Sequence, residues 1–231
     1  MSGNAGGDVK SRKGAAQDAR TRETREKLLE GALRTLVEQG IAKASARAIA
    51  TTAGVNQALV FYHFGSVDEL LAAACRHGAE QRVARHRERL RSVGSLTELL
   101  AFGRALHAEE REAGHVDFLG QLLAGARAHP RLVPATAAGL DLWIAEIEQV
   151  LVRVLAGTPL AEFTDPAGLA RAVAASFVGL ELYEGVDPAG AEAAFAALEQ
   201  LGALMAAVEE LNPVARKAVT YTLRRQSGRA R

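Results

Sequence analysis

The sequence predicts an all-α protein, and three observations carry that prediction. Alanine supplies 47 of the 231 residues, and it combines with leucine, glutamate and arginine, which also favour helix. Apolar residues recur three and four residues apart, as one face of a helix requires. β-branched and aromatic residues nowhere form the alternating pattern of a strand. With 48% hydrophobic residues, the chain can bury a sizeable core.

The N-terminal part is expected to begin with an arm and a helix. Residues 1–20 are small, polar and basic, and we expect them to be disordered. From Thr21 the pattern changes, and Leu29 and Leu36 fall on one helical face with charged residues opposite. Gly40 follows that helix in the position where a left-handed residue ends it.

The segment 45–64 predicts two short helices separated by a tight turn. Ser45 is the expected N-cap of a helix over Ala46–Thr52, and Asn56 is the expected cap of a second helix that ends at Phe64. The break between them contains Gly54, which accepts the positive φ that such a turn needs. Two short helices around a glycine turn form a helix-turn-helix.

The rest of the chain predicts longer helices. Ser66 and Glu69 have the spacing of a capping box for the first of them. Asp165, Asp187 and Asn212 each precede a proline, as helix caps do. The expected spans are Val67–Arg91, Leu96–Ala113, Val116–Ala128, Leu132–Leu155, Asp165–Gly185, Ala189–Glu210 and Val214–Arg225.

The charges are segregated along the chain. A formal net charge of +1 conceals +6 over residues 1–91, −11 over residues 92–212 and +6 over residues 213–231. The basic N-terminal part therefore suggests a polyanion as partner. The basic C-terminal stretch has no assigned surface.

The helix-turn-helix has the residues that a DNA reader needs. Its inner face would be closed by apolar residues, and an exposed Phe-Tyr pair on the second helix is costly unless it meets a partner. Glutamine pairs with adenine, an alanine or aromatic ring contacts the thymine methyl, and hydroxyls and arginine contact phosphates. The candidate DNA-binding residues are Ser45, Ala46, Arg47, Asn56, Gln57, Ala58, Phe61, Tyr62 and His63.

These motifs resemble the DNA-binding domain of TetR-type transcriptional regulators. The matching residues, between Thr21 and about Gln81, are Leu28-Leu29, Ala32-Leu33, Gly40, Ser45-x-Arg47-x-Ile49-Ala50, Ala53-Gly54-Val55, Phe61-Tyr62-His63-Phe64 and Ser66-x-x-Glu69-Leu70. The family usually has Tyr at Phe61 and Lys at Val67. We therefore expect the affinity to depend more on Arg47 and the N-terminal arm.

The resemblance implies a homodimeric, cytoplasmic regulator, in most members a repressor that a small-molecule effector releases from a pseudo-palindromic operator in double-stranded DNA. It implies a helix-turn-helix domain over residues 21–81 and a helical ligand-binding and dimerisation domain over residues 82–225, before a basic tail over residues 226–231. Neither the effector nor the operator sequence can be read from the chain.

The second domain has candidates for both of its implied roles, chosen as long apolar faces with a few polar groups. The candidate effector-pocket residues are Phe102, His107, Phe118, Gln121, Leu122, Trp143, Ile147 and Phe177. The candidate dimer-interface residues are Leu169, Val173, Phe177, Leu180, Phe195, Leu198, Leu201 and Met205.

Other classes of protein have less support in the sequence. An architectural DNA-binding protein without a sensor pocket is the main alternative. Glu112-x-x-His115 has the spacing of a di-iron site, but one copy is too few, and His107-x-x-Glu110 is interpreted as a surface pair. We expect no enzyme activity, no cofactor and no metal. The longest apolar run, Ala172–Leu180, falls short of the roughly 18–20 residues of a membrane span, and Cys75 alone allows no internal disulfide.

Overall fold

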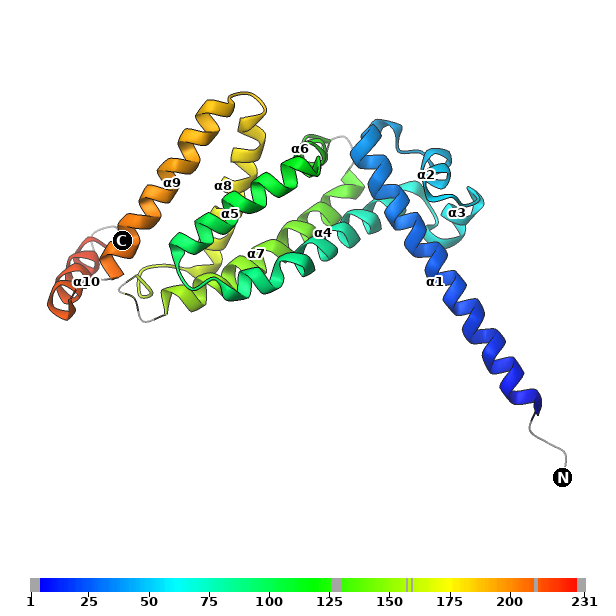
Figure 1. Ribbon diagram of the computed structural model, residues 1–231, viewed down its shortest axis with the longest axis horizontal. Coiled ribbons are helices and arrows are strands. Elements are labelled where there is room, and N and C mark those ends of the chain that lie inside the picture. The colour runs from blue at the N-terminus through cyan, green and yellow to red at the C-terminus, as the bar shows by residue number, and fades with distance from the viewer. Residues whose placement is uncertain (1–4, 126–129, 157, 159, 210–211, 228–231) are drawn as a thin grey trace. The chain divides into compact units, whose positions relative to one another are not determined.

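The computed structural model describes residues 5–125, 130–156, 158, 160–209 and 212–227, and these form helices joined by turns (Figure 1). The all-α prediction is confirmed. The helices are α1 (Ala5–Gln39), α2 (Ala46–Ala53), α3 (Ala58–Phe64), α4 (Val67–Ser92), α5 (Leu96–Glu112), α6 (His115–Gly125), α7 (Val133–Leu155), α8 (Pro166–Glu184), α9 (Pro188–Glu209) and α10 (Pro213–Ser227), with 3₁₀ turns at Ile41–Lys43 and Pro130–Leu132.

The chain divides into two compact units. The first contains Met1–Gly78 and Gln121–Ala137, and the second contains Ala79–Gly120 and Ala138–Arg231. The boundary after Gly78 lies close to the one expected after residue 81. The expected helix Val116–Ala128 corresponds to α6, and residues 126–129 lie outside the described part of the chain.

Helix α1 differs from the prediction at its N-terminal end. It begins at Ala5, so residues 5–20, expected as a disordered arm, are helical. Residues 14–20 are exposed. The physical reason is local: once residues 21–39 form a helix that packs, each further residue extends an existing nucleus. The stretch Ala15-Ala16-Gln17-Asp18-Ala19-Arg20 is rich in helix formers and needs no tertiary contact to continue it.

The first unit is built on a close approach of α1 and α2. A Cβ placed on Gly31 would lie 2.7 Å from the Cβ of Ala53, so only glycine fits there without a shift. The buried Thr35 donates its hydroxyl to the carbonyl of Gly31 at 2.8 Å, and Arg34 donates to the carbonyl of Thr52 at 2.7 Å. These contacts hold α2 against α1 and so position the turn that follows.

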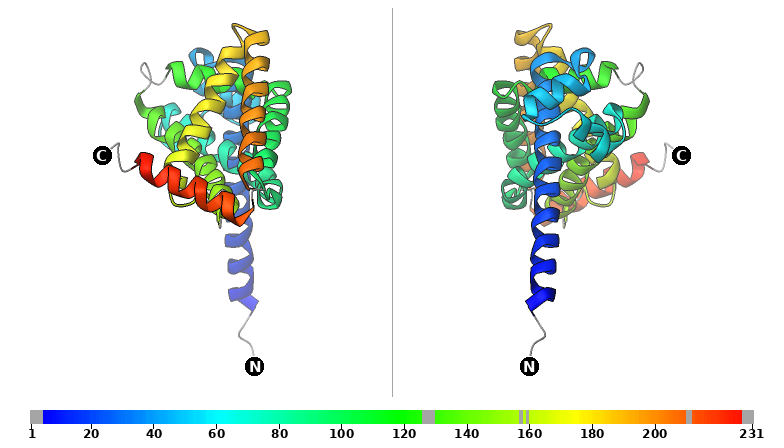
Figure 2. Two further views of the ribbon diagram at one scale, coloured as in Figure 1. Left: turned by 90° about the vertical axis from the view of Figure 1, so that its left-hand side faces the viewer. Right: turned by 90° about the vertical axis from the view of Figure 1, so that its right-hand side faces the viewer.

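The second unit packs α9 against both α5 and α8, which Figures 1 and 2 show as neighbours. Helix α8 begins as expected: Asp165 accepts hydrogen bonds from the backbone N–H groups of Ala167 and Gly168, and Pro166 is the first helical residue. The hydrophobic core of the second unit includes Leu90, Val93, Leu99, Val150, Leu151, Val154, Leu155 and Ala170. Helix α10 contacts the loop before α8 through Arg224 and Glu162, 2.6 Å apart.

Candidate functional site

Local hydrogen bonds set the geometry of α2, the turn and α3. Ser45 caps α2, with its Oγ accepting from the N–H of Ala48 at 3.2 Å. Gly54 adopts φ +67°, and the N–H of Val55 donates back to the carbonyl of Ala50 at 3.0 Å. Asn56 accepts from the N–H of Ala58 at 2.8 Å. The predicted cap at Ser45 and the turn at Gly54 are therefore present, whereas the N-cap residue of α3 is Gln57 and not the predicted Asn56.

Apolar side chains lock α3 into the first unit. Ile49 and Val60 are fully buried, and Ala50 is nearly so. Phe64 is half-buried at the end of α3, and the guanidinium of Arg25 in α1 lies over its ring, 5.0 Å from the centroid. Such a cation–π contact, together with the buried seam, fixes the orientation of the helix.

The opposite face of α2 and α3 is exposed. Phe61 is 50% exposed and Tyr62 is 77% exposed, both unusually high for aromatic residues. Their neighbours on this face are also exposed, namely Ser45, Arg47, Asn56, Gln57 and Ala58. Seven of the nine candidate DNA-binding residues are thus exposed at the start of α2, in the turn and on α3, and we call this set of seven the α2–α3 face.

The remaining two candidates differ from that pattern. Ala46 is 6% exposed and packs into the core of the unit, so its side chain cannot contact DNA. Its burial follows from its position on the inner side of α2, next to the N-cap. His63 is half-buried, and its ring lies 4.9 Å from that of Tyr62 in an edge-on arrangement, which places it as a support for Tyr62.

Comparison with known proteins identifies this region. Residues 28–74, which contain the α2–α3 face, match the family model "Bacterial regulatory proteins, tetR family". This region is therefore similar to the DNA-binding domain of TetR-type transcriptional regulators. The chain has the TetR-type fold of a DNA-binding regulator, as the resemblance in its sequence implied.

Solved structures of the TetR fold resemble most of the chain. A transcriptional regulator from Rhodococcus sp. Rha1 is 26% identical with a TM-score of 0.59, over 78% of this chain and 95% of that one. The multidrug binding protein EbrR, complexed with imidazole, is 26% identical with a TM-score of 0.57, over 77% and 93% of the two chains. Escherichia coli NemR shares the fold at 19% identity and a TM-score of 0.63, over 77% and 96%. No curated protein matches the chain by sequence.

The described candidate effector residues divide between two places in the second unit and one place in the first. Phe102, Trp143 and Ile147 are partly buried against the hydrophobic core. His107 and Phe177 lie together elsewhere, with ring centroids 6.1 Å apart. Leu122 is buried but belongs to the first unit. The side chains of Phe118 and Gln121 lie outside the described part of the structure.

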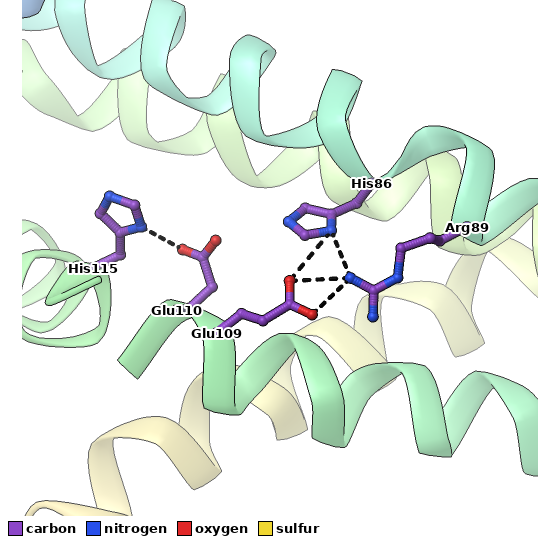
Figure 3. Close-up of polar contacts among 5 residues, drawn as sticks. All are labelled: His86, Arg89, Glu109, Glu110 and His115. Atoms are coloured by element: carbon purple, nitrogen blue, oxygen red, sulfur yellow. Dashed lines mark hydrogen bonds and ion pairs between the residues drawn. The ribbon is translucent and has the colours of Figure 1, made fainter. Parts of the chain in front are cut away.

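Polar residues gather where α4, α5 and α6 meet, and sequence reasoning missed most of them (Figure 3). Arg89 donates to both oxygens of Glu109 at 2.7 and 3.0 Å, and the Nδ1 of His86 lies 3.9 Å from Glu109. Burial lowers the pKa of His86. The Nδ1 of His115 lies 3.0 Å from Glu110, not beside Glu112 as the Glu-x-x-His spacing would require.

A second set of charged residues continues this network toward α8. We call it the buried ionic cluster; it comprises Arg82, His107, Glu110, His115, Glu181 and Glu184. His107 is only 7% exposed, so its interpretation as part of a surface pair with Glu110 is wrong. Its Nε2 lies 2.8 Å from Glu184 instead. The partners come from helices far apart in sequence, which no spacing rule detects.

Burial and charge shift the carboxyl groups of the cluster in opposite directions. Burial raises the pKa of Glu181 to about 7, and the neighbouring Glu110 adds to that rise. Burial also disfavours ionisation of Glu110, but the hydrogen bond with His115 and the charge of Arg82 outweigh it and lower the pKa of Glu110. Thus Glu110 is ionised at neutral pH, while Glu181 is poised between its two forms.

The candidate dimer residues differ in their burial within the single chain. Leu169 packs against the hydrophobic core, Phe195 is 8% exposed, and the ring of Phe177 faces His107. Of the eight, Leu201 is the exposed one at 57%, and Val173, Leu180, Leu198 and Met205 are half-buried. Apolar or small residues lie on more than one side of α8 and α9, so the periodicity alone could not tell the core face from the outer one.

An exposed apolar stripe runs instead along the outer faces of α8 and α9. Its members recur three or four residues apart, as one helix face requires. On α8 they are Ala172, Ala175, Ser176, Gly179, Leu182 and Tyr183, with Val186 two residues beyond its end. On α9 they are Ala193, Ala197, Leu201 and Leu204.

Two further properties concern the described residues only. Among them, no group of three or more His, Cys, Asp or Glu side chains is arranged to hold a metal ion. No single described helix is long and apolar enough to cross a membrane, and only the bent pair of α3 and α4 passes that test, by length and composition.

Proposed function

We propose that the chain is a homodimeric repressor that acts in the cytoplasm. It binds a pseudo-palindromic operator through the α2–α3 face of each protomer and leaves that operator when a small-molecule effector binds the second unit. The observation that carries the proposal is the α2–α3 face itself. A helix locked from behind by buried Val60 presents Gln57 and the exposed Tyr62 outward, as a recognition helix in a major groove does.

Each exposed side chain has a role that suits its chemistry. Gln57 pairs with adenine, and Ala58 and Phe61 contact thymine methyl groups. Arg47 and Tyr62 contact phosphates and set the register of the helix. The N-terminal +6 charge supplies the salt-dependent part of the affinity, and dimerisation doubles it.

The exposed stripe on α8 and α9 supports the homodimer. Leu182, Val186, Leu201 and Leu204 are 44–85% exposed in the single chain, which is costly in water. Small residues such as Gly179 and Ala197 allow the corresponding helices of a second copy to approach closely. The two-fold pairing of this stripe would form a four-helix bundle.

The second unit supplies the proposed response to an effector. EbrR, which resembles this chain, has been crystallised with imidazole and with proflavin, both small organic molecules. We propose that a small organic effector binds here too, and that it shifts the population toward a dimer whose two α3 helices no longer match the groove spacing. The effector must then bind the two states with different affinity.

Selection of binding sites from a random duplex library tests the proposal. The full-length protein should enrich an inverted repeat whose half-sites lie about one helical turn apart. Retention of duplexes without any enriched sequence would contradict it and would indicate an architectural DNA-binding protein instead.

A further inference from the structure

Two buried nitrogen atoms of the ionic cluster lack a hydrogen-bond partner among the described residues: Nδ1 of His107 and Nε of Arg82. The Nε2 of His107 lies 2.8 Å from Glu184. When Nε2–H donates to that carboxylate, Nδ1 is left as a bare acceptor. The nearest carboxyl oxygen of Glu181 is 3.9 Å from Nδ1, too far for a direct hydrogen bond. An N–H donor that reached Nδ1 and Glu181 would satisfy these two acceptors, whereas Nε of Arg82 is itself a donor.

The charges around Nδ1 of His107 favour a cation. Three carboxyl groups, those of Glu110, Glu181 and Glu184, face two arginines, of which Arg82 is mostly buried and Arg111 is 62% exposed. Glu181 is surrounded by Arg82 of α4, His107 and Glu110 of α5, and Glu184 of α8 itself. Glu110 also pairs with His115 of α6. Burial and the other carboxylates raise the pKa of Glu181 to about 7, so the positive charge of Arg82, which acts in the opposite direction, compensates its ionised form only in part.

Two aromatic rings lie against the ring of His107. Phe177 meets the ring of His107 edge-on at 6.1 Å, and Phe195 lies tilted at 5.0 Å. The guanidinium of Arg104 already lies over the ring of Phe195, 5.8 Å from its centroid. Aromatic faces attract cations and pack against flat apolar groups.

We propose that the buried ionic cluster binds an effector that carries a protonated nitrogen next to an aromatic group. The N–H donates to Nδ1 of His107 and to the carboxylate of Glu181, and the apolar part packs against Phe177 and Phe195. This assignment rests on the proposed effector response and adds the chemical class of the effector. Because the cation favours the ionised form of Glu181, binding at neutral pH releases a proton.

Three probes of one ring size test the proposal: 1-naphthylmethylamine, 1-naphthylmethanol and 1-naphthoic acid, titrated calorimetrically into the full-length protein at pH 8. The amine should bind at least about tenfold more tightly than the alcohol, as one favourable buried charge contact provides, and the acid should bind most weakly. Equal binding of the alcohol or the acid would overturn the proposal, as would the absence of binding by all three at millimolar concentration.

Glu181→Gln keeps the shape of the site and removes its charge. It should weaken the amine by about tenfold or more and leave the alcohol nearly unchanged, whereas Glu88→Gln, at an 83% exposed carboxylate of α4, should change neither. Lowering the pH from 8 to 6 should weaken amine binding by about tenfold in the parent protein, because Glu181 takes up a proton, and much less in Glu181→Gln. A pH response identical in both proteins would count against the assignment.

Sequence-selective DNA binding by the same protein separates the two proposals. If the parent enriches an operator but shows no preference for the amine, the cation assignment fails and the regulator stands. If no sequence is enriched, the repressor proposal fails whatever the probes show.

Discussion

The α2–α3 face and the buried ionic cluster are two candidate sites built in opposite ways. The α2–α3 face comes from 20 consecutive residues, 45–64, and puts its polar residues on the outside of a buried apolar seam. The ionic cluster comes from α4, α5, α6 and α8 and puts its charges on the inside. A surface that reads DNA needs access and little desolvation, whereas a site that recognises one small molecule gains from burial because its charge contacts strengthen there.

The largest predicted effect is a change in the free energy of unfolding, caused by the buried carboxyl group of Glu181 in the second unit. The folded pKa of Glu181 is raised from 4.5 to about 7, so the folded chain holds an extra proton between these values and loses stability as the pH rises through them. Glu181→Gln should therefore be more stable than the parent at pH 8, by at most about 3 kcal/mol, and equally stable at pH 4.5. Denaturant unfolding at the two pH values measures the difference.

The exposed carboxylate of Glu88 provides the control for this experiment. Glu88→Gln should leave the pH dependence as it is in the parent. A Glu181→Gln chain that loses stability at pH 8 would show that the charge of Glu181 is compensated in the folded state.

The next effect concerns the scaffold behind the α2–α3 face. Gly31→Ala puts a methyl group 2.7 Å from the Cβ of Ala53, so α2 must move away from α1, at a cost of about 1–3 kcal/mol. Hydrogen exchange should accelerate in α1 and α2 and stay unchanged in α5 and α8.

Gly103→Ala is the matched variant for Gly31→Ala. Gly103 also lies inside a helix, but a Cβ there meets no atom within 4 Å, so alanine should be neutral or stabilise by up to about 1 kcal/mol. Equal effects of the two substitutions would remove the close approach of α1 and α2 as the reason for Gly31.

These two sites also explain what could be predicted from the sequence. The cap at Ser45 and the turn at Gly54 were predicted because each depends on residues within five positions along the chain. Glu181 was missed because it lies between apolar residues of α8 and its partners, His107 and Arg82, are distant in sequence. Phe195 was assigned to the dimer interface because apolar residues lie on more than one side of α9, and its contact with His107 requires the fold.

A smaller effect tests the phosphate contacts proposed for the α2–α3 face. Arg47→Ala should weaken binding to every duplex alike, by about tenfold or less, and reduce the slope of log Kd against log salt by about 1. Filter or fluorescence titrations over a range of salt concentrations measure both quantities. Arg91→Ala, which removes an exposed arginine paired with Glu88, serves as the control and should leave the slope unchanged.

The most direct test compares Gln57→Ala with the parent on the selected operator and on a random duplex at the same salt concentration. If Gln57 reads a base, the variant should lose about 1–3 kcal/mol of binding free energy on the operator and almost none on the random duplex. Equal losses on the two duplexes would contradict the account, because the α2–α3 face would then hold DNA without reading its sequence.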